Sequence, residues 1–261
     1  MTVAEIAGVG LVAAVAYMTV LWLVSLALRN ASIVDIFWGL GFVLITLVYL
    51  AAGDGWDARQ ALVLGLVSAW GLRLSGYILW RNHGKGEDFR YRRMREAAGA
   101  SFWWRSYLQV FVLQGLLLWV ISAPLLASQH NAEPDHLAVT DVLGALVWAV
   151  GFFFEAAGDW QLARFKSDPA NKGKVMRYGL WRYTRHPNYF GDATLWWGYF
   201  IIAAGTTDGW VTAFGPAIMT VLLMRVSGVA LLERTLKREK PEYADYIART
   251  SAFVPWLPKR G

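Results

Sequence analysis

Residues 5–28, EIAGVGLVAAVAYMTVLWLVSLAL, determine the fold class, because they form a long apolar run whose only charge, Glu5, lies at its edge. A helix needs roughly 20 mostly apolar residues to cross the hydrocarbon core of a bilayer. Backbone polar groups must be paired inside lipid, so the run is predicted to be a helix. It is too long for a signal peptide's apolar region, and no lysine or arginine precedes it, so we expect a membrane anchor.

The same pattern recurs along the chain and predicts seven transmembrane helices. Their expected positions are about residues 5–28, 32–52, 60–80, 106–127, 138–160, 189–204 and 210–232. The chain is 56% hydrophobic, whereas soluble domains are usually under half apolar. We therefore expect an all-α integral membrane protein forming one domain over residues 1–261. The sequence has no cysteine, which excludes disulfides, a thiol nucleophile and cysteine metal sites.

The positive charges predict the orientation. All of the 25 lysine and arginine residues except Arg59, Arg73 and Arg225 fall on one side of an alternating seven-helix path. Positive loops mark the cytoplasmic side. We therefore expect the N-terminus outside and the C-terminus in the cytoplasm. The expected location is a bacterial inner membrane, with the active site facing the cytoplasm.

Several ionisable residues fall within predicted helices, near their cytoplasmic ends, where such residues usually mark function. They are Asp35, Arg73, Glu155, Asp159, Asp192, Arg225 and Glu233. Charges this close to a helix end can also snorkel to water, and Asp35 follows Ser32 at a spacing that permits a capping role. Glu155 and Asp159 share one helical face. They could accept hydrogen bonds from ribose hydroxyls or an amide, or form salt bridges with Arg73 or Arg225.

The densest polar segment is KGKVMRYGLWRYTRHPNYFGD, residues 172–192. Basic side chains interleaved with glycine can wrap a polyphosphate. Pro187 suits the first turn of a helix, which would place Arg185, His186 and Asn188 at an anion-attracting N-terminus. A basic patch on anionic lipid is the alternative, but such a patch does not require this ordered run of residues.

The run Arg185-His186-Pro187-Asn188-Tyr189, followed by Gly191 and Asp192, resembles a signature of three groups of membrane enzymes. These are the steroid 5α-reductases, the sterol C14 reductases and the isoprenylcysteine carboxyl methyltransferases. With Phe165-Lys166, Asp168-Pro169 and Asn171-Lys172-Gly173 added, the block is most similar to a bacterial branch grouped with the steroid 5α-reductases. The resemblance extends over nearly the whole chain, from Ser32 to Tyr246.

The resemblance implies NADPH as cofactor, held by the half of the chain from about residue 139 to 261 together with one arginine of the third helix. The expected cofactor-binding residues are Arg73, Glu155, Asp159, Arg164, Lys174, Arg177, Tyr178, Arg185, His186, Asn188, Tyr189, Asp192 and Glu233. The steroid enzymes also use an acid on helix two and a tyrosine on helix three to polarise the substrate carbonyl. Asp35 is the nearest acid. The tyrosine position is Trp70 here, so Tyr77, one turn beyond Arg73, is the expected replacement.

We therefore expect an NADPH-dependent reductase that transfers hydride to the conjugated C=C of a lipophilic enone, such as a 3-oxo-Δ4 steroid or a related lipid. The substrate would enter from the bilayer and the cofactor from the cytosol. A methyltransferase using S-adenosylmethionine and a non-enzymatic lipid-binding or transport protein remain alternatives. The many basic residues favour NADPH, because S-adenosylmethionine carries no phosphate.

Two further patterns do not indicate a site. The run GVGLVA at residues 8–13 matches a dinucleotide-binding pattern, but it lies in a predicted membrane helix with no preceding strand. His130, Glu133, Asp135 and His136 lie in a short outer loop, which indicates a solvated loop rather than a metal site. The basic loops lack the architecture of a nucleic-acid-binding module, so no nucleic acid partner is expected.

Overall fold

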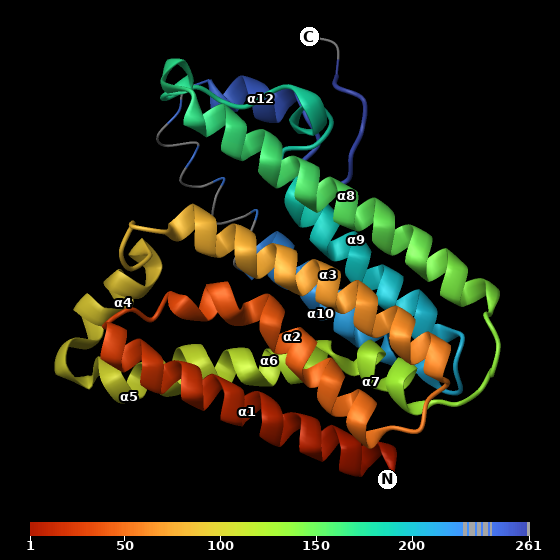
Figure 1. Ribbon diagram of the computed structural model, residues 1–261. Helices are drawn as coiled ribbons and strands as arrows, with labels where there is room; N and C mark the ends of the chain where they lie inside the picture. The colour runs from red at the N-terminus through yellow and green to blue at the C-terminus, as the bar shows by residue number, and fades with distance from the viewer. Residues whose placement is uncertain (227–228, 230–232, 234–235, 237–239, 241, 260–261) are drawn as a thin grey trace. The chain divides into compact units, whose positions relative to one another are not determined.

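The computed structural model describes residues 1–226, 229, 233, 236, 240 and 242–259. The helices are α1 (Val3–Leu28), α2 (Ile33–Ala52), α3 (Asp57–Asn82), α4 (Phe89–Ala98), α5 (Phe102–Ser106), α6 (Leu113–Ile121), α7 (Ala123–His130), α8 (Val139–Ser167), α9 (Pro187–Ala204), α10 (Phe214–Val221) and α12 (Tyr243–Arg249) (Figure 1). The 3₁₀ segments are η1 (Gly99–Ser101), η3 (Pro169–Asn171), η4 (Gly179–Arg182) and η5 (Gly209–Ala213). The π-helical segments are η2 (Tyr107–Val112) and η6 (Leu222–Val226).

Within the described part of the chain, 6 helical segments are long and apolar enough to cross a membrane. They are Val3–Leu28, Ile33–Ala52, Asp57–Asn82, Phe89–Ile121, Val139–Ser167 and Gly209–Val226. The predicted span at residues 189–204 falls on α9, which is not among them and has polar residues in its first two turns. The all-helical, multi-pass character is therefore confirmed. Seven crossings and the orientation of the termini stay predictions.

The chain divides into two compact units. The first comprises Met1–Ala138 with Ala203–Thr212, and the second comprises Val139–Ile202 with the chain from Ala213 onward. In the first unit, α2 packs against both α1 and α3. A Cβ atom at Gly39 would lie 2.6 Å from the carbonyl oxygen of Gly71, and one at Gly71 equally close to the carbonyl oxygen of Gly39. Glycines at this crossing thus let the backbones of α2 and α3 touch, as small residues do in membrane bundles.

Two polar side chains buried in the first unit make reciprocal contacts with each other's backbone. Gln60 Nε2 donates to the carbonyl of Gln129 at 2.8 Å, and Gln129 Nε2 donates to the carbonyl of Gln60 at 3.1 Å. Arg59 is fully buried, donates to the carbonyl of Pro134 at 2.8 Å and lies over the ring of Trp56. These contacts join the start of α3 to the segment that follows α6.

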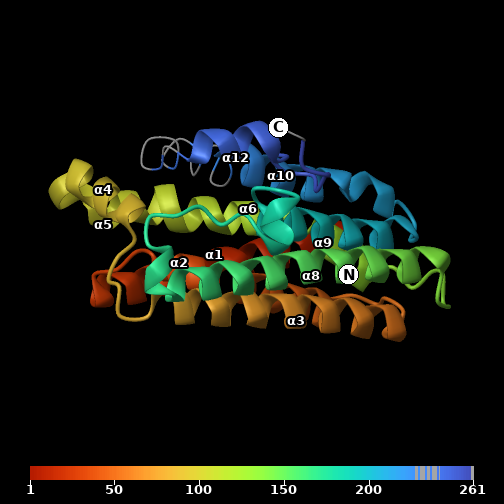
Figure 2. The same cartoon turned by 90° about the horizontal axis from the view of Figure 1, so that it is seen from above.

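In the second unit, α8 and α9 run side by side (Figures 1 and 2), and glycines line the contact. Gly144, Gly151 and Gly158 recur every seventh residue on α8, and Gly191 and Gly198 do so on α9. Their carbonyls and backbone atoms approach so closely that a Cβ at Gly198 would lie 2.7 Å from the carbonyl oxygen of Gly144. A seven-residue spacing keeps these glycines on one helix face, so the backbones meet along that face.

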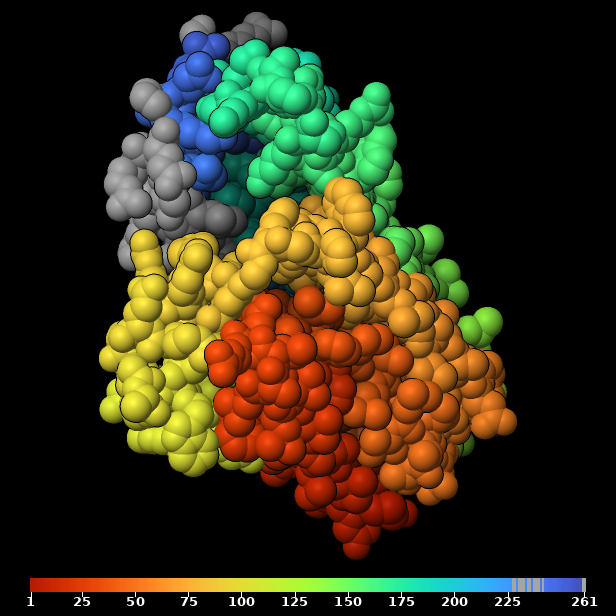
Figure 3. All heavy atoms as spheres, turned by 60° about the vertical axis from the view of Figure 1, so that its left-hand side comes forward, coloured from red at the N-terminus to blue at the C-terminus, as the bar shows by residue number. Residues whose placement is uncertain are grey.

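The loop after α8 is fixed to α8 on one side and to the C-terminal segment on the other. Trp181 packs with Phe165 and Met176, and its indole N–H donates to the carbonyl of Gly158 at 3.1 Å. The hydroxyl of Tyr246, on α12, donates to the carbonyl of Trp181. Figure 3 shows α12, in blue, against this loop, in green. The loop that leads into the Arg185-His186-Pro187 run is therefore held by contacts from both neighbouring segments.

Candidate functional site

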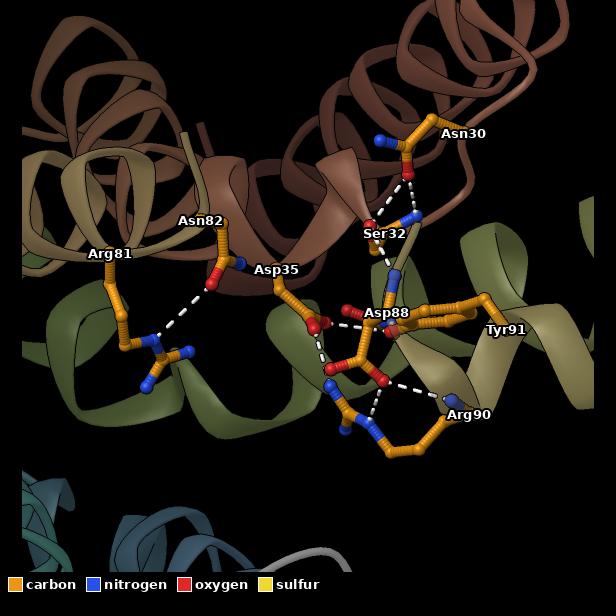
Figure 4. A network of polar contacts seen from close by, with 9 residues as sticks. Asn30, Ser32, Asp35, Arg81, Asn82, Asp88, Arg90 and Tyr91 are labelled. Carbon is orange, nitrogen blue, oxygen red and sulfur yellow. Dashed lines mark hydrogen bonds and ion pairs between the residues drawn. The ribbon is translucent and has the colours of Figure 1, made fainter. Parts of the chain in front are cut away.

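Asp35, in the first turn of α2, has both carboxylate oxygens engaged by side chains of α4 (Figure 4). Arg90 Nη2 donates to Asp35 Oδ2 at 2.6 Å, and the Tyr91 hydroxyl donates to Asp35 Oδ1 at 2.7 Å. Gln114 Nε2, from α6, lies 3.5 Å from the same hydroxyl. Tyr91 is only 6% exposed. An acid and a phenol thus meet in a largely enclosed position.

The turn between α1 and α2 anchors α4 to this acid. The Ser32 hydroxyl donates to Asn30 Oδ1 at 2.6 Å and accepts from the backbone N–H of Asp88 at 3.2 Å. Ser32 makes no side-chain capping bond to α2, so the capping alternative for the Ser32–Asp35 pattern is not what the structure has. The side chain of Asp88 instead caps α4 by accepting from the N–H of Arg90.

Glu87 strengthens the same connection. It accepts from Arg95 at 2.8 Å and from the backbone N–H of Ala31 at 2.7 Å. Burial opposes ionisation of Glu87, but these two donors outweigh burial and hold its pKa below the ordinary value. Charged contacts at the start of α4 therefore hold the Tyr91 hydroxyl against Asp35.

Tyr77, Arg73 and Trp70 lie on α3. The guanidinium carbon of Arg73 is 5.3 Å from the centre of the Tyr77 ring, and that of Arg81 is 5.6 Å away on the same ring. Trp70 is fully buried and packs against Phe42 at 5.6 Å. Tyr77 stays a predicted catalytic residue. The tyrosine whose hydroxyl contacts Asp35 is Tyr91. Tyr91 is not among the residues predicted from the sequence, although an aromatic residue within the basic run FRYRR, residues 89–93, is a visible signal.

In the second unit, Arg185 and His186 converge on Glu233. Arg185 Nε donates to Glu233 Oε1 at 2.7 Å, and His186 Nε2 is 3.2 Å from the same oxygen. Arg185 Nη1 also donates to the carbonyl of Thr250. Burial works against ionisation of Glu233, but His186 and Arg185 lower its pKa to about 2. Arg185 thus connects the start of α9 to the C-terminal segment.

The structure brings together Asn188 and Asp159, which the sequence analysis predicts separately as cofactor-binding residues. Asn188 Nδ2 donates to Asp159 Oδ1 at 3.0 Å, which joins the N-terminus of α9 to α8. Glu155 lies one turn before Asp159, and both are nearly fully buried. The ring of Tyr189 stacks on His186 at 5.6 Å. Asp192 lies one turn beyond Asn188 on α9, so these side chains follow one another along the α8–α9 contact.

Arg164, Lys174, Arg177 and Tyr178 lie further toward the surface. Arg164 lies over the ring of Trp160, and Lys174 is exposed. Arg177 donates to Asp245 at 3.1 Å and to the carbonyl of Glu242 at 2.7 Å. Tyr178 is 56% exposed and lines a cavity of 470 Å³ together with Arg177. The predicted cofactor residues of the second unit therefore form two groups. One is buried on α8 and α9, and the other is basic and lies at the surface.

Comparison with known proteins gives the family. A model described as "Protein of unknown function (DUF1295)" matches residues 21–250. This chain belongs to the DUF1295 family. It is 23% identical over 274 residues to "Uncharacterized protein C594.04c" of Schizosaccharomyces pombe, an alignment that covers 95% of this chain and 79% of that relative. No solved structure matches this DUF1295 chain.

A second relative of this DUF1295 chain is named by its activity. The chain is 26% identical over 114 residues to 3-oxo-5-alpha-steroid 4-dehydrogenase 1 of Bos taurus. The alignment covers 44% of this chain and 41% of the bovine protein. This partial similarity agrees with the superfamily that the Arg-His-Pro block resembles. It does not test the expected bacterial branch within that superfamily.

Proposed function

We propose that this chain is an NADPH-dependent membrane reductase, which transfers hydride to the conjugated C=C of a lipophilic enone. The single observation that carries the proposal is the contact between Asp35 and the Tyr91 hydroxyl at 2.7 Å. The steroid 5α-reductases, which the sequence resembles, use an acid and a tyrosine to polarise a carbonyl. Trp70 takes the place of that tyrosine on α3, and Tyr91, on α4, supplies the phenol instead.

The acid–tyrosine pair suits stabilisation of an enolate. When hydride reaches the β-carbon of an enone, negative charge develops on the carbonyl oxygen, and a hydrogen-bond donor about 3 Å away stabilises that charge. Tyr91 has one hydroxyl proton and donates it to Asp35, so a substrate carbonyl would compete with Asp35 for this proton. The α-carbon then takes a proton from water, which completes the saturated ketone.

Arg90 has a positioning role in this proposal. Its guanidinium binds Asp35 Oδ2 at 2.6 Å and Asp88 Oδ1 at 2.9 Å, which fixes the carboxylate plane of Asp35 relative to α4. These contacts hold in place the acid and the phenol that would polarise the substrate carbonyl.

The donor set of the second unit fits a phosphorylated dinucleotide. Arg177, Arg182 and Arg249 line the 470 Å³ cavity, and arginines recognise phosphate through paired N–H donors. Asn188 and Asp159 offer an amide and a carboxylate of the kind that binds ribose hydroxyls or a carboxamide. NADPH, when bound, would supply the hydride. The chemistry of these residues is what supports NADPH over a cofactor without phosphates.

The substrate class rests on the membrane location and on the named relative. The bovine relative is called a 3-oxo-5-alpha-steroid 4-dehydrogenase, so a 3-oxo-Δ4 steroid or a related lipid enone is the proposed substrate. An apolar substrate of this kind dissolves in the bilayer, so it would enter from lipid, in a bacterial inner membrane with the active site on the cytoplasmic face.

The proposal is tested by cofactor titration of the purified protein, with mass spectrometry of any copurified nucleotide. We expect NADPH to bind, and Lys174→Ala and Arg177→Ala each to weaken it about tenfold or more, since a charge-assisted hydrogen bond contributes about 1.5–3 kcal/mol. Arg185→Ala is expected to weaken NADPH binding too, but it also removes the contacts to Glu233 and Thr250. If S-adenosylmethionine binds tightly and NADPH does not, the chain is a methyltransferase. Binding of neither favours a lipid-binding or transport protein.

A further inference from the structure

The 470 Å³ cavity in the second unit lies between the loop after α8 and the C-terminal segment. The loop contributes Arg177 and Arg182, and α12 contributes Arg249 and Asp245. Of these arginines, only Arg177 is among the cofactor residues that the sequence predicts. The cavity wall therefore carries three guanidinium groups and one carboxylate, which leaves it positively charged.

Asp245 holds two of the three guanidinium groups in place. Arg249 Nε donates to Asp245 Oδ1 at 2.9 Å, and Arg177 Nη1 donates to Asp245 Oδ2 at 3.1 Å. The carboxylate uses one oxygen for each arginine, so both side chains are oriented before any ligand binds. Preorganised donors lose less side-chain entropy on binding than free ones do.

Arg182 differs from its neighbours, because its side chain makes no hydrogen bond or ion pair within the described ranges of the chain. It is exposed and lines the cavity from the 3₁₀ segment η4. The contact of Arg249 with Asp245 uses only its Nε, which leaves its two terminal nitrogens as further donors. The cavity thus combines one fully available guanidinium with one partly available guanidinium.

The rest of the cavity wall suits a nucleotide. Tyr178 presents a ring that is 56% exposed and makes a T-shaped contact with the ring of Phe165, with the ring centres 5.9 Å apart. Tyr246 is buried, and its hydroxyl is bonded to the carbonyl of Trp181, so it forms a fixed part of the wall. An exposed aromatic face beside guanidinium groups can stack a base next to a bound phosphate.

We propose that this cavity is a phosphomonoester site, in which Arg182 and Arg249 bind the phosphate and Arg177 and Asp245 orient them. A phosphomonoester carries close to two negative charges at neutral pH and has three acceptor oxygens, which matches the surplus of positive charge and of N–H donors. The same chemistry occurs in the 2′-phosphate of NADPH and in the headgroup of phosphatidic acid. The first source rests on the proposed function, and it makes the cavity the origin of a preference for NADPH over NADH.

The test compares NADPH and NADH binding by the purified full-length protein and by two variants, Arg182→Gln and Arg249→Gln. We expect each variant to weaken NADPH binding by about tenfold to a hundredfold, with NADH binding changed by less than about twofold. Lys85→Gln is the control, because Lys85 is an exposed cation between α3 and α4, outside the cavity and outside the basic segment 172–192, and it should leave both affinities at the parental values. Thermal unfolding of each variant checks that the fold is intact.

The outcomes separate the site from the proposed function. If the parent prefers NADPH and both arginine variants keep that preference, the phosphomonoester site is wrong and the proposed function stands. If the parent binds neither dinucleotide, the proposed function fails. Vesicles of phosphatidylcholine with and without phosphatidic acid then decide the site. Phosphatidic acid binding that both variants lose assigns the site to a lipid headgroup, and the absence of such binding overturns it.

Discussion

The packing of α8 against α9 predicts what Gly191 does. A Cβ atom at this position would lie 2.5 Å from the carbonyl oxygen of Gly151 and 2.9 Å from the Cα of Glu155. Both atoms belong to the backbone of α8, so no side-chain rotation can relieve the overlap. Gly191→Ala must therefore push the two helices apart, and overpacking of this kind costs about 1–3 kcal/mol.

Thermal unfolding in detergent measures this effect. For a chain of this size 1 kcal/mol corresponds to roughly 2–4 °C, so Gly191→Ala should unfold about 2–12 °C below the parent protein. Gly65→Ala on α3 is the matched control, because nothing lies within 4 Å of its added Cβ. An alanine in a helix is favoured over glycine by about 0.5–1 kcal/mol, so this variant should unfold at or slightly above the parental temperature.

The result that would refute this reasoning is a Gly191→Ala protein that unfolds with the parent. If that protein had also lost its affinity for NADPH, the glycine would be needed for close approach of the cofactor and not for helix packing. Gly191 lies between the expected cofactor residues Asn188 and Asp192, which makes a cofactor role the alternative, whereas the distances favour packing, so the two readouts separate the explanations.

Three further predictions follow from the structure. Tyr91→Phe should lower the turnover of enone reduction by about 10²–10³ with NADPH binding intact, whereas a larger loss in Tyr77→Phe would return the donor role to Tyr77. The low pKa of Glu233, about 2, means that its ion pairs stabilise the fold above about pH 4.5 and that this contribution is lost as the pH falls toward 2. As the pH is lowered, the unfolding temperature of Glu233→Gln should therefore fall less than that of the parent protein. An equal fall in both proteins would contradict a stabilising role of the Glu233 ion pairs. Reporter fusions should place Asn131 outside and the C-terminus in the cytoplasm, and a cytoplasmic signal at Asn131 would contradict the topology.

The long apolar helices could be predicted from the sequence because their length and composition are local properties. The expected spans at about 5–28, 32–52 and 60–80 correspond to α1, α2 and α3, with the structure extending α3 to Asp57–Asn82. Helix α4 lies within a loop that the sequence characterises only by its positive charge. Its placement depends on Glu87, Asp88 and Tyr91 contacting residues more than 50 positions earlier, such as Ala31 and Asp35.

For the candidate site, the sequence could select residues but not their contacts. Asp35, Asn188 and Asp159 were selected because each lies in a recognisable motif, and their roles stay predictions, whereas the contact between Asn188 and Asp159 is known from the structure alone. The partner of Asp35 could not be identified from spacing along α3, since it comes from a different helix. The contacts of Arg185 with Glu233 and Thr250 likewise join segments distant in sequence, which a local basic pattern does not reveal.

The most direct test of the proposed reaction is the transfer of isotope from the cofactor. The purified protein is incubated with NADPH carrying deuterium at the nicotinamide C4 position and with lipophilic enones, 3-oxo-Δ4 steroids first, and the products are analysed by mass spectrometry and NMR. The proposed function predicts a saturated ketone with deuterium on the former β-carbon, and a much lower yield of it from Tyr91→Phe. A saturated product without deuterium at that carbon, or conversion of no enone while a methyl group is transferred from S-adenosylmethionine, would contradict it.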